Sequence, residues 1–327
     1  MAHTASLSQL QTPRWASVNG DLVAYGDVRI HIGAEALTRA LSVFEGVKGY
    51  WDDSGETFAL RSPRRHYDRL CRSARLLHVP IRFGYEEYVG WLARLGAELV
   101  VPERDLWFRT TLYGVEGHWG EGTVADLVTT AYTQTTADPT PMRAAVSTWR
   151  RGGDSVLPAR IKSAANYVMG RVARIEANRA GADEAVLLNE SGRVAEATGA
   201  CVVIVDRSGL VTPPPTEGCL DSITVDALEE LCATTGIPFS RRPIERTELL
   251  VAQECGLVGT ITELTPVAEV DGHSYALDGL LADVRRSYLG VMRGRSALAS
   301  APLVPLLRRD GAEIRPVTPT PLVGAAE

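Results

Sequence analysis

The sequence lacks the apolar segments that a membrane protein needs. Nowhere in its 327 residues do about 18 apolar residues occur together, and no apolar run follows a basic N-terminal start. These two absences argue against a transmembrane helix and against a secretory signal. We therefore expect a protein that works in the cytoplasm and has no membrane partner.

The chain also has few cysteines, and its net charge is negative. The five cysteines form no CxxC pair and show no metal-ligand spacing; they are Cys71, Cys201, Cys219, Cys232 and Cys255. Several lie on apolar periodic faces, which favours buried thiols over disulfides, and we expect no metal site. The formal net charge of -6 and the pI near 5.6 argue against a nucleic-acid partner.

The sequence does contain enough apolar material for a large core. Hydrophobic residues make up 45% of the chain, and its length allows two domains. Residues 134–141 are polar and contain proline, which is typical of an interdomain linker. We predict an α/β (α+β) fold with a smaller N-terminal α+β domain at 1–133 and a larger C-terminal domain at 142–300. Residues 301–327 are predicted to be a disordered tail, because they lose periodicity and are rich in proline and small residues.

Apolar periodicity and turn residues predict the regular elements. Before the linker we expect a hairpin of 22–24 with 28–32, strands at 41–51, 57–60, 106–113 and 127–132, helices from Pro63 to before Pro80 and over 85–99, and a flexible loop at 114–122. After the linker we expect strands at 185–188, 193–196, 200–205, 210–212, 257–262 and 267–270, a helix that starts just after Lys162 and ends at Ala180-Gly181, and helices within 220–235 and 282–290.

Two stretches carry residue types suited to chemistry. Lys162 stands just before a periodic helix, and Glu196 follows on the next hairpin. By itself this arrangement is ambiguous, since most lysines are solvated surface residues. The expected strand at 106–113 places Trp107 and Arg109 on one face, where an arginine beside an aromatic ring can simply be stacked and half exposed. The expected face of the helix after Lys162 consists of Ala164, Tyr167, Val168, Arg171, Val172 and Ile175.

An ordered set of motifs favours a role in chemistry for these residues. In chain order the motifs are Val43-Phe-Glu-Gly46, Arg64-Arg-His-Tyr-Asp-Arg-Leu70, Lys162-Ser-Ala-Ala-Asn-Tyr167, Gly181-Ala-Asp-Glu-Ala185, Glu196-Ala-Thr-Gly199, Thr212-Pro-Pro214, Leu220-Asp-Ser-Ile-Thr224 and Gly259-Thr-Ile-Thr-Glu-Leu-Thr-Pro-Val267. The set resembles the class IV (fold-type IV) pyridoxal-phosphate aminotransferases, and most of all their branched-chain aminotransferase group. One such motif would be weak, but the ordered set covers most of the chain.

The resemblance implies a fold, an assembly and a reaction. It implies a two-domain fold-type IV enzyme whose C-terminal domain contains an antiparallel meander or pseudo-barrel. It also implies a homodimer or higher homo-oligomer, because the family builds its pocket with loops from both subunits. The implied reaction is a ping-pong transfer of an amino group from an amino acid to a 2-oxo acid.

The resemblance also assigns residues to the cofactor ring of pyridoxal 5′-phosphate. Lys162 is implied as the catalytic amine that carries the cofactor as an imine and later moves protons. Tyr167 is implied to hydrogen-bond the 3-oxygen of the ring. Glu196 is implied to face the pyridine nitrogen and keep it protonated.

A second group of residues is implied to hold the cofactor phosphate. Ile223 and Thr224 begin a helix, and helix N-termini offer free N–H groups and a favourable dipole. Thr260 is implied to add a hydroxyl. Arg64 is implied to clamp the phosphate, because a planar guanidinium can hold two oxygens at once.

The substrate side of the site matches the family less well. Phe44 and Ile261 are expected in the pocket wall, Arg109 is implied to meet the substrate carboxylate, and His118 and Trp119 are candidate specificity residues. Family members carry tyrosine and glycine where this chain has Arg39 and Ala40, tyrosine in place of Trp107, and glycine in place of Ser222. We hypothesise that Arg39 points into the pocket and recognises a second anionic or polar group; the alternative is an arginine in a surface salt bridge.

Three other functions remain open at this point. The same fold also hosts a lyase acting on aminodeoxychorismate, and transaminases for D-amino acids or amines. A catalytically inactive binding homologue is a third option, although the presence of Lys162, Tyr167, Glu196 and Thr260 argues against it. The sequence leaves the amino donor, the acceptor and the stereochemistry undecided.

Overall fold

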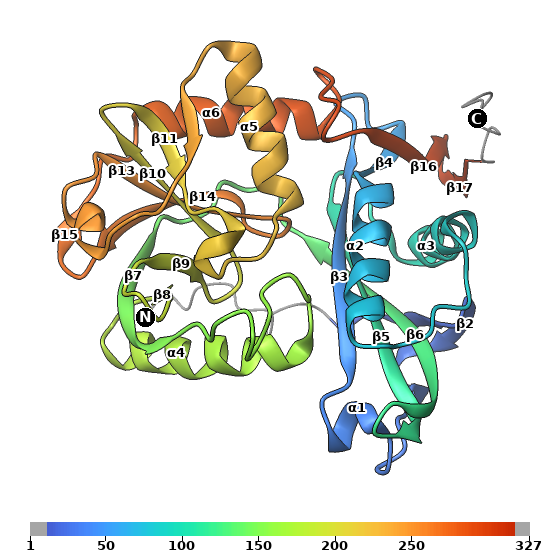
Figure 1. Cartoon of the computed structure of the whole chain (residues 1–327). Helices are drawn as coiled ribbons and strands as arrows, with labels where there is room; N and C mark the ends of the chain where they lie inside the picture. The colour runs from blue at the N-terminus through green and yellow to red at the C-terminus, as the bar shows by residue number, and fades with distance from the viewer. Residues whose placement is uncertain (1–11, 318–327) are drawn as a thin grey trace, which may run out of the picture.

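The computed structural model describes residues 12–317, which form two curled β-sheets flanked by helices (Figure 1). The helices are α1 (Glu35–Thr38), α2 (Pro63–Leu76), α3 (Tyr85–Leu99), α4 (Tyr167–Arg179), α5 (Ile223–Thr235) and α6 (Leu280–Met292), with short 3-10 helices at Tyr25–Asp27, Ala164–Asn166, Pro215–Glu217 and Arg246–Leu250. The strands are β1 (Trp15–Val18), β2 (Asp21–Ala24), β3 (Ser42–Trp51), β4 (Thr57–Arg61), β5 (Asp105–His118), β6 (Glu121–Gln134), β7 (Met142–Arg150), β8 (Glu184–Leu188), β9 (Val194–Ala197), β10 (Cys201–Asp206), β11 (Gly209–Thr212), β12 (Phe239–Arg241), β13 (Glu254–Gly259), β14 (Glu263–Val270), β15 (His273–Ser274), β16 (Leu303–Asp310) and β17 (Glu313–Pro316).

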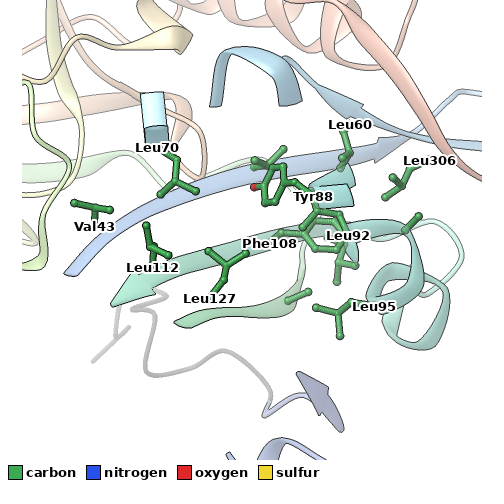
Figure 2. Packing of buried hydrophobic residues seen from close by; sticks show 14 of the residues in the cluster. Val43, Leu60, Leu70, Tyr88, Leu92, Leu95, Phe108, Leu112, Leu127 and Leu306 are labelled. Carbon is green, nitrogen blue, oxygen red and sulfur yellow. The ribbon is translucent and has the colours of Figure 1, made fainter. Parts of the chain in front are cut away.

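The first sheet has eight strands in the order β17-β16-β4-β3-β5-β6-β1-β2. Helices α2 and α3 pack on it and enclose an apolar core drawn from β3, β4, both helices, β5, β6 and β16 (Figure 2). The labelled core residues are Val43, Leu60, Leu70, Tyr88, Leu92, Leu95, Phe108, Leu112, Leu127 and Leu306. Full burial of one such side chain contributes about 1.5–3 kcal/mol, so this core is a major source of the stability of the first sheet.

The second sheet has nine strands, eight of them in the order β12-β11-β10-β13-β14-β7-β8-β9, with β15 paired to β14. Helices α5 and α6 cover β10 and β13 through a shared apolar cluster, and the small side chains Ala173 and Ala177 of α4 pack on Ala185 and Leu187 of β8. Helix α5 ends where Gly236 adopts φ +72°, a conformation that glycine tolerates better than other residues. Within residues 12–317 no helix is long and apolar enough to cross a membrane.

The end of the chain differs from its prediction. Residues 303–316 form β16 and β17, and β16 pairs antiparallel with β4 (Figure 1, red strands). Leu306 and Leu307 of β16 are buried in the core of the first sheet, so composition alone was misleading about this segment. The first sheet therefore includes residues from both ends of the chain, and the remaining part of the predicted tail, 318–327, lies outside the described residues.

Two local predictions for the first half of the chain are also corrected. The hairpin joins β1 to β2 through Asn19 and Gly20, whereas residues 28–32 form no strand. The predicted loop 114–122 is mostly paired, because β5 and β6 extend into a long hairpin that turns at Trp119 and Gly120. Glycines within the hairpin coincide with its irregular pairing, which is why the segment looked like a loop in the sequence.

The buried face of α4 also differs from its prediction. The helix buries its small residues Gly170, Ala173 and Ala177, whereas Val168 is 59% exposed and Ile175 is 38% exposed. Close packing against β8 selects the small residues, and this preference outweighs hydrophobicity. The other helices and most central strands lie close to their predicted positions.

Candidate active site

Lys162 lies where the two halves of the molecule meet. Its N–H donates to the Ser73 hydroxyl on α2 at 3.1 Å, and its carbonyl accepts from the Phe44 N–H on β3 at 2.9 Å. The next residue, Ser163, forms an antiparallel bridge with Val43. These contacts fix the main chain at Lys162 and Ser163 against α2 and β3.

The amine of Lys162 is held by a phenol and two aromatic rings. Its Nζ lies 2.8 Å from the Tyr167 hydroxyl, 4.9 Å from the centroid of the Phe44 ring and 5.3 Å from the centroid of the Tyr167 ring. The two rings meet edge to face with centroids 4.9 Å apart. Lys162 and Tyr167 are therefore in direct contact.

The lysine content of the chain makes this amine easy to single out. The sequence has two lysines, Lys48 and Lys162. The ammonium of Lys48 is buried and lies 2.6 Å from Glu263 and 3.5 Å from Asp105. In the described residues Lys162 has no carboxylate partner at ion-pair distance, so it is the lysine whose amine is available to a bound molecule.

Glu196 lies in the same pocket as Lys162. The pocket is lined by Arg151, Ala159, Ile161, Lys162, Asn166, Tyr167, Gly170, Leu187, Glu196, Thr198 and Leu220. One oxygen of Glu196 accepts the Leu220 N–H at 3.0 Å, and the other lies 3.1 Å from Arg151 Nε. Burial raises the pKa of Glu196, while Arg151, the Leu220 N–H and Lys162 oppose that rise. The carboxyl group is therefore placed to gain from a further cationic donor in the pocket.

The start of α5 offers an anion site near this pocket. Ser222 caps the helix, with its side chain accepting the Val225 N–H at 3.3 Å and its carbonyl accepting the Asp226 N–H at 3.2 Å. The first two N–H groups, of Ile223 and Thr224, have no intrahelical partner, as at any helix N-terminus. They point in the direction in which the helix dipole favours negative charge.

Arg69 of α2 lies against this helix start. Its Nη1 donates to the Asp221 carbonyl at 2.7 Å, directly before the Ser222 cap. Its other nitrogens lie 2.6 Å and 2.9 Å from the two oxygens of Glu45, and the side chain is almost fully buried. A fixed guanidinium thus accompanies the free N–H groups of α5.

Glu45 is the residue that fixes Arg69. It is fully buried on β3, and it also accepts a hydrogen bond from His66 Nδ1 at 2.8 Å. Although burial alone would raise its pKa, Arg69 and His66 hold the pKa of this carboxyl well below its ordinary value. Glu45 therefore remains ionised and ties α2 to the first sheet.

The prediction for Arg64 is corrected by this geometry. The Arg64 side chain is 61% exposed, and its Nε pairs with Asp68 one turn along α2 at 3.0 Å. Its guanidinium also lies over the Tyr85 ring at 5.0 Å. Helix α2 instead turns Pro63, His66, Arg69, Leu70, Ser73 and Ala74 inward, so Arg69 is the arginine at the site and Arg64 belongs to the surface.

Arg109 and Trp107 share the face of the first sheet that carries Phe44. The Arg109 guanidinium lies over the Phe44 ring at 4.4 Å, and burial lowers its pKa. Within residues 12–317 Arg109 has no ion-pair or hydrogen-bond partner. The buried Trp107 indole lies over Gly46, where a Cβ would come within 2.5 Å of its Nε1, and this N–H also has no partner in the described chain. The face that carries Phe44 thus holds a half-buried arginine without a partner and a buried indole N–H without a partner.

Three of the proposed substrate residues lie away from this pocket. Arg39 follows α1 and lies 3.9 Å from Glu35 and 4.7 Å from the Trp119 ring centroid, next to His118 at the end of the β5–β6 hairpin. Within one chain this arrangement corresponds to the surface salt bridge that was the alternative for Arg39. Thr260 and Ile261 lie in the turn between β13 and β14. A Cβ added at Gly259, at the start of this turn, would lie 3.6 Å from the Gly199 carbonyl beside Thr198.

Several residues of the site escaped prediction from the sequence. Ser73 and Arg69 are polar, so an apolar helical face does not include them, although both follow His66 at helical spacing. Arg151 follows β7 directly, and no local pattern distinguishes it from the neighbouring Arg150. The Leu220 N–H is a backbone group, which side-chain patterns do not reveal.

Comparisons with known proteins place this chain in a family. A family model for class IV amino-transferases matches residues 42–270. A probable branched-chain-amino-acid aminotransferase of Aquifex aeolicus is 30% identical over 293 residues, which cover 86% of this chain and 93% of that protein.

Solved structures agree with these sequence matches. The branched-chain aminotransferase of Thermoproteus uzoniensis with norvaline superposes with a TM-score of 0.83 at 28% identity, over 89% of this chain and 99% of that one. The PLP-form of the enzyme from Thermobaculum terrenum gives a TM-score of 0.79 at 29% identity, over 87% and 95% of the two chains. The fold, the family match and the relatives therefore agree that this chain is a transaminase of the class IV aminotransferase family.

Proposed function

We propose that this enzyme binds pyridoxal 5′-phosphate at Lys162. The observation that carries the proposal is the free amine of Lys162, held by the Tyr167 phenol in a pocket that also contains the buried carboxyl of Glu196. A pyridinium N–H would supply the cationic donor that Glu196 is placed to accept. One of the similar solved structures is described as a PLP-form, which supports the same assignment.

The proposed phosphate site is the start of α5. The free N–H groups of Ile223 and Thr224 and the guanidinium of Arg69 would hold the phosphate, and the Thr260 hydroxyl would add a donor. Arg69 suits this role because Glu45 already fixes its orientation, so little side-chain entropy is lost on binding. In this proposal Arg69 takes the role that the sequence had suggested for Arg64.

The proposed chemistry divides between cofactor and protein. When bound, pyridoxal phosphate supplies an electron sink for the carbon that carries the amino group. Lys162 provides the amine that holds the group and, once released, the base that moves the proton at that carbon. The Tyr167 hydroxyl, 2.8 Å from Nζ, orients this amine, and Glu196 keeps the opposite end of the site negative.

We further propose an amino acid and a 2-oxo acid as the two substrates. Arg109 is a partly buried cation without a carboxylate partner in residues 12–317, which suits recognition of a substrate carboxylate. The relatives favour branched-chain amino acids over the lyase and over transaminases for D-amino acids or amines. Because Trp107 presents an unpaired N–H beside Arg109, we expect a tolerance for polar side chains as well.

The assembly belongs to the same proposal. Arg39, His118 and Trp119 gather at the end of the β5–β6 hairpin, and Trp119 is 78% exposed. We propose a cytoplasmic homodimer in which this cluster of one subunit covers the Lys162 pocket of the other. A role for Arg39 in substrate recognition would then be exerted across the subunit interface.

A spectroscopic assay tests the proposed function. Purified protein with added pyridoxal phosphate is mixed anaerobically with single amino acids, including leucine, isoleucine, valine and glutamate. We expect the visible absorbance to bleach with at least one donor and to return when a 2-oxo acid is added, and Lys162→Ala to abolish turnover. If none of the amino acids bleaches the absorbance, the proposed transamination of these donors is wrong. If the protein does not bind pyridoxal phosphate, the proposed cofactor is wrong.

A further inference from the structure

The second lysine of the chain lies in a buried network of charges. Lys48 is on β3, on the same face as Phe44 and Gly46, and only 4% of its side chain is exposed. Its Nζ lies 2.6 Å from Glu263 Oε1 and 3.5 Å from Asp105 Oδ2. A buried ammonium is costly without a counter-charge, and two carboxylates supply it here.

Arg293, just after α6, completes this network. Its guanidinium binds both oxygens of Asp105, at 3.2 Å and 3.1 Å, and its Nη1 also donates to the Trp51 carbonyl at 3.2 Å. The Tyr50 ring lies 4.9 Å from Lys48 Nζ and 5.7 Å from the Arg293 guanidinium. The network therefore connects β3 and β5 of the first sheet with the end of α6 and with β14 of the second.

Glu263 is the member of the network that adjoins the turn between β13 and β14. It is the first residue of β14 and follows the turn of Thr260, Ile261 and Thr262. Its backbone has φ +54°, a left-handed conformation that is unfavourable for a residue with a side chain. Such a conformation persists only when its surroundings fix it, and the 2.6 Å contact with Lys48 is the strongest constraint on its side chain.

The same turn lies beside the start of α5. Val258 of β13 and Leu264 of β14 flank the turn, and both belong to the apolar cluster that contains Val225 in the first turn of α5. At its other end, a Cβ added at Gly259 would lie 3.6 Å from the carbonyl of Gly199, next to Thr198 of the Lys162 pocket. The turn at 259–263 is therefore bounded by the pocket, by α5 and by the Lys48 network.

We propose that Lys48 is a positioning residue, whose ion pair with Glu263 holds the turn at 259–263 in the arrangement that receives the phosphate of the cofactor. This inference rests on the proposed function and adds a residue to it. Lys48 touches neither cofactor nor substrate; it acts from the first sheet on a turn of the second. The carboxylates of the network also explain how the ammonium group of Lys48 can be buried.

The test compares two ligands that differ only in the phosphate. Dissociation constants for pyridoxal phosphate and for pyridoxal are measured for the wild type, Lys48→Met, Lys48→Arg and Glu263→Gln, together with kcat and KM. Loss of one charge-assisted contact at the phosphate corresponds to about 10-fold in affinity. For Lys48→Met and Glu263→Gln we expect about 10-fold weaker binding of pyridoxal phosphate, unchanged binding of pyridoxal, and faster hydrogen exchange at 259–263. Lys48→Arg keeps the charge and should recover much of the loss.

A matched control separates this effect from the loss of any ion pair between the two parts of the chain. Arg295 pairs with Asp53 at 2.6 Å, but both side chains are more than half exposed, so Arg295→Met should leave both dissociation constants unchanged. If Lys48→Met does not fold, Glu263→Gln carries the test, because it retains an amide that can accept from Lys48.

Unchanged binding of pyridoxal phosphate in the folded variants would overturn the inference, as would equal losses for pyridoxal and pyridoxal phosphate. The wild type distinguishes this failure from a failure of the proposed function. A wild type that binds pyridoxal phosphate and transfers amino groups, beside variants that do so equally well, rejects the role of Lys48 alone. A wild type that does not bind pyridoxal phosphate rejects the proposed function itself.

Discussion

The two lysines of the chain differ in what surrounds their ammonium groups. Lys48 is enclosed by Glu263 and Asp105, whereas the polar partner of Lys162 Nζ is the phenol of Tyr167. An ammonium group that is buried and paired with two carboxylates is not accessible to a bound molecule. The environment thus distinguishes two residues that composition treats alike.

The role proposed for Arg109 can be tested by replacing this single residue. Arg109→Met keeps much of the packing on Phe44 but removes the charge that we assign to the substrate carboxylate. A hydrogen bond to a charged group contributes about 1.5–3 kcal/mol, so kcat/KM for the amino donor should fall by about 10- to 100-fold. Steady-state kinetics measures this effect. A variant that binds pyridoxal phosphate normally and keeps wild-type kcat/KM would show that another group recognises the carboxylate.

Single residues also show how far the sequence alone could go. Lys162, Tyr167 and Glu196 lie together in the structure as the motifs suggested, because each is fixed by an element that short-range pattern defines. Arg64 and Arg69 belong to one motif and one helix, and only the rotation of α2 on the sheet decides which of them faces inward. That rotation depends on the buried contact of Arg69 with Glu45, a residue 24 positions earlier in the chain. No local pattern contains that information.

At the scale of elements, the attachment of α2 to β3 is electrostatic as well as apolar. Glu45 on β3 holds both Arg69 and His66 of α2. Breaking a buried ion pair by removing one partner typically costs about 3–5 kcal/mol, because the other charge remains buried. The same contact orients Arg69 toward α5, so the stability of α2 and the geometry of the phosphate site depend on one carboxylate.

The pH dependence of stability tests this attachment. The pKa of Glu45 is depressed in the folded state, so its contribution is fully present above the ordinary glutamate pKa of about 4.3 and is lost as pH falls below that value. Glu45→Gln should therefore be about 3–5 kcal/mol less stable than wild type at pH 7. The difference should shrink between about pH 5 and pH 3. Urea unfolding at several pH values measures it, and a difference that is constant with pH would contradict the assignment.

The β16 strand lies in a segment whose composition predicted a disordered tail, and its packing can be tested. Leu307 is fully buried against the first sheet, while Leu303 on the same strand is 38% exposed. Leu307→Ala should lower the free energy of unfolding by about 2–5 kcal/mol, and Leu303→Ala should have a much smaller effect. Equilibrium unfolding measures the effect of each variant, and the two are matched because both replace a leucine of β16 with alanine. Equal and small effects would mean that β16 does not pack on β4, as the sequence had suggested for a tail.

At the scale of the whole molecule, the groups that surround Lys162 come from both parts of the fold. The first sheet and its helix α2 supply Phe44 and Ser73, and the part of the chain that forms the second sheet supplies Tyr167 and Glu196. Periodicity predicts each sheet separately, but it carries no information about how they face each other. Resemblance to a family supplied that part of the prediction, and the superposition on solved structures agrees with it.

Subunit complementation tests the proposed dimer. Arg39 and Trp119 lie together at the hairpin end, apart from the Lys162 pocket of their own chain. If they complete the pocket of the partner, a mixture of Lys162→Ala with a chain carrying both Arg39→Ala and Trp119→Ala should regain activity. In a random equimolar mixture about half of the dimers are mixed and one of the two sites in each is intact, so about a quarter of all sites would be intact. Activity after co-refolding that equals the sum of the separate variants would argue against a shared site.

The most direct measurement concerns the amine that holds the cofactor. The protein is incubated with pyridoxal phosphate, reduced with sodium borohydride and digested, and its peptides are analysed by mass spectrometry. Because the chain has only Lys48 and Lys162, each lysine can be followed in its own peptide. We predict one phosphopyridoxyl group on the peptide that contains Lys162 and none on the peptide that contains Lys48. A label on Lys48, or no labelled lysine in a protein that binds pyridoxal phosphate, would contradict the assignment of the active site.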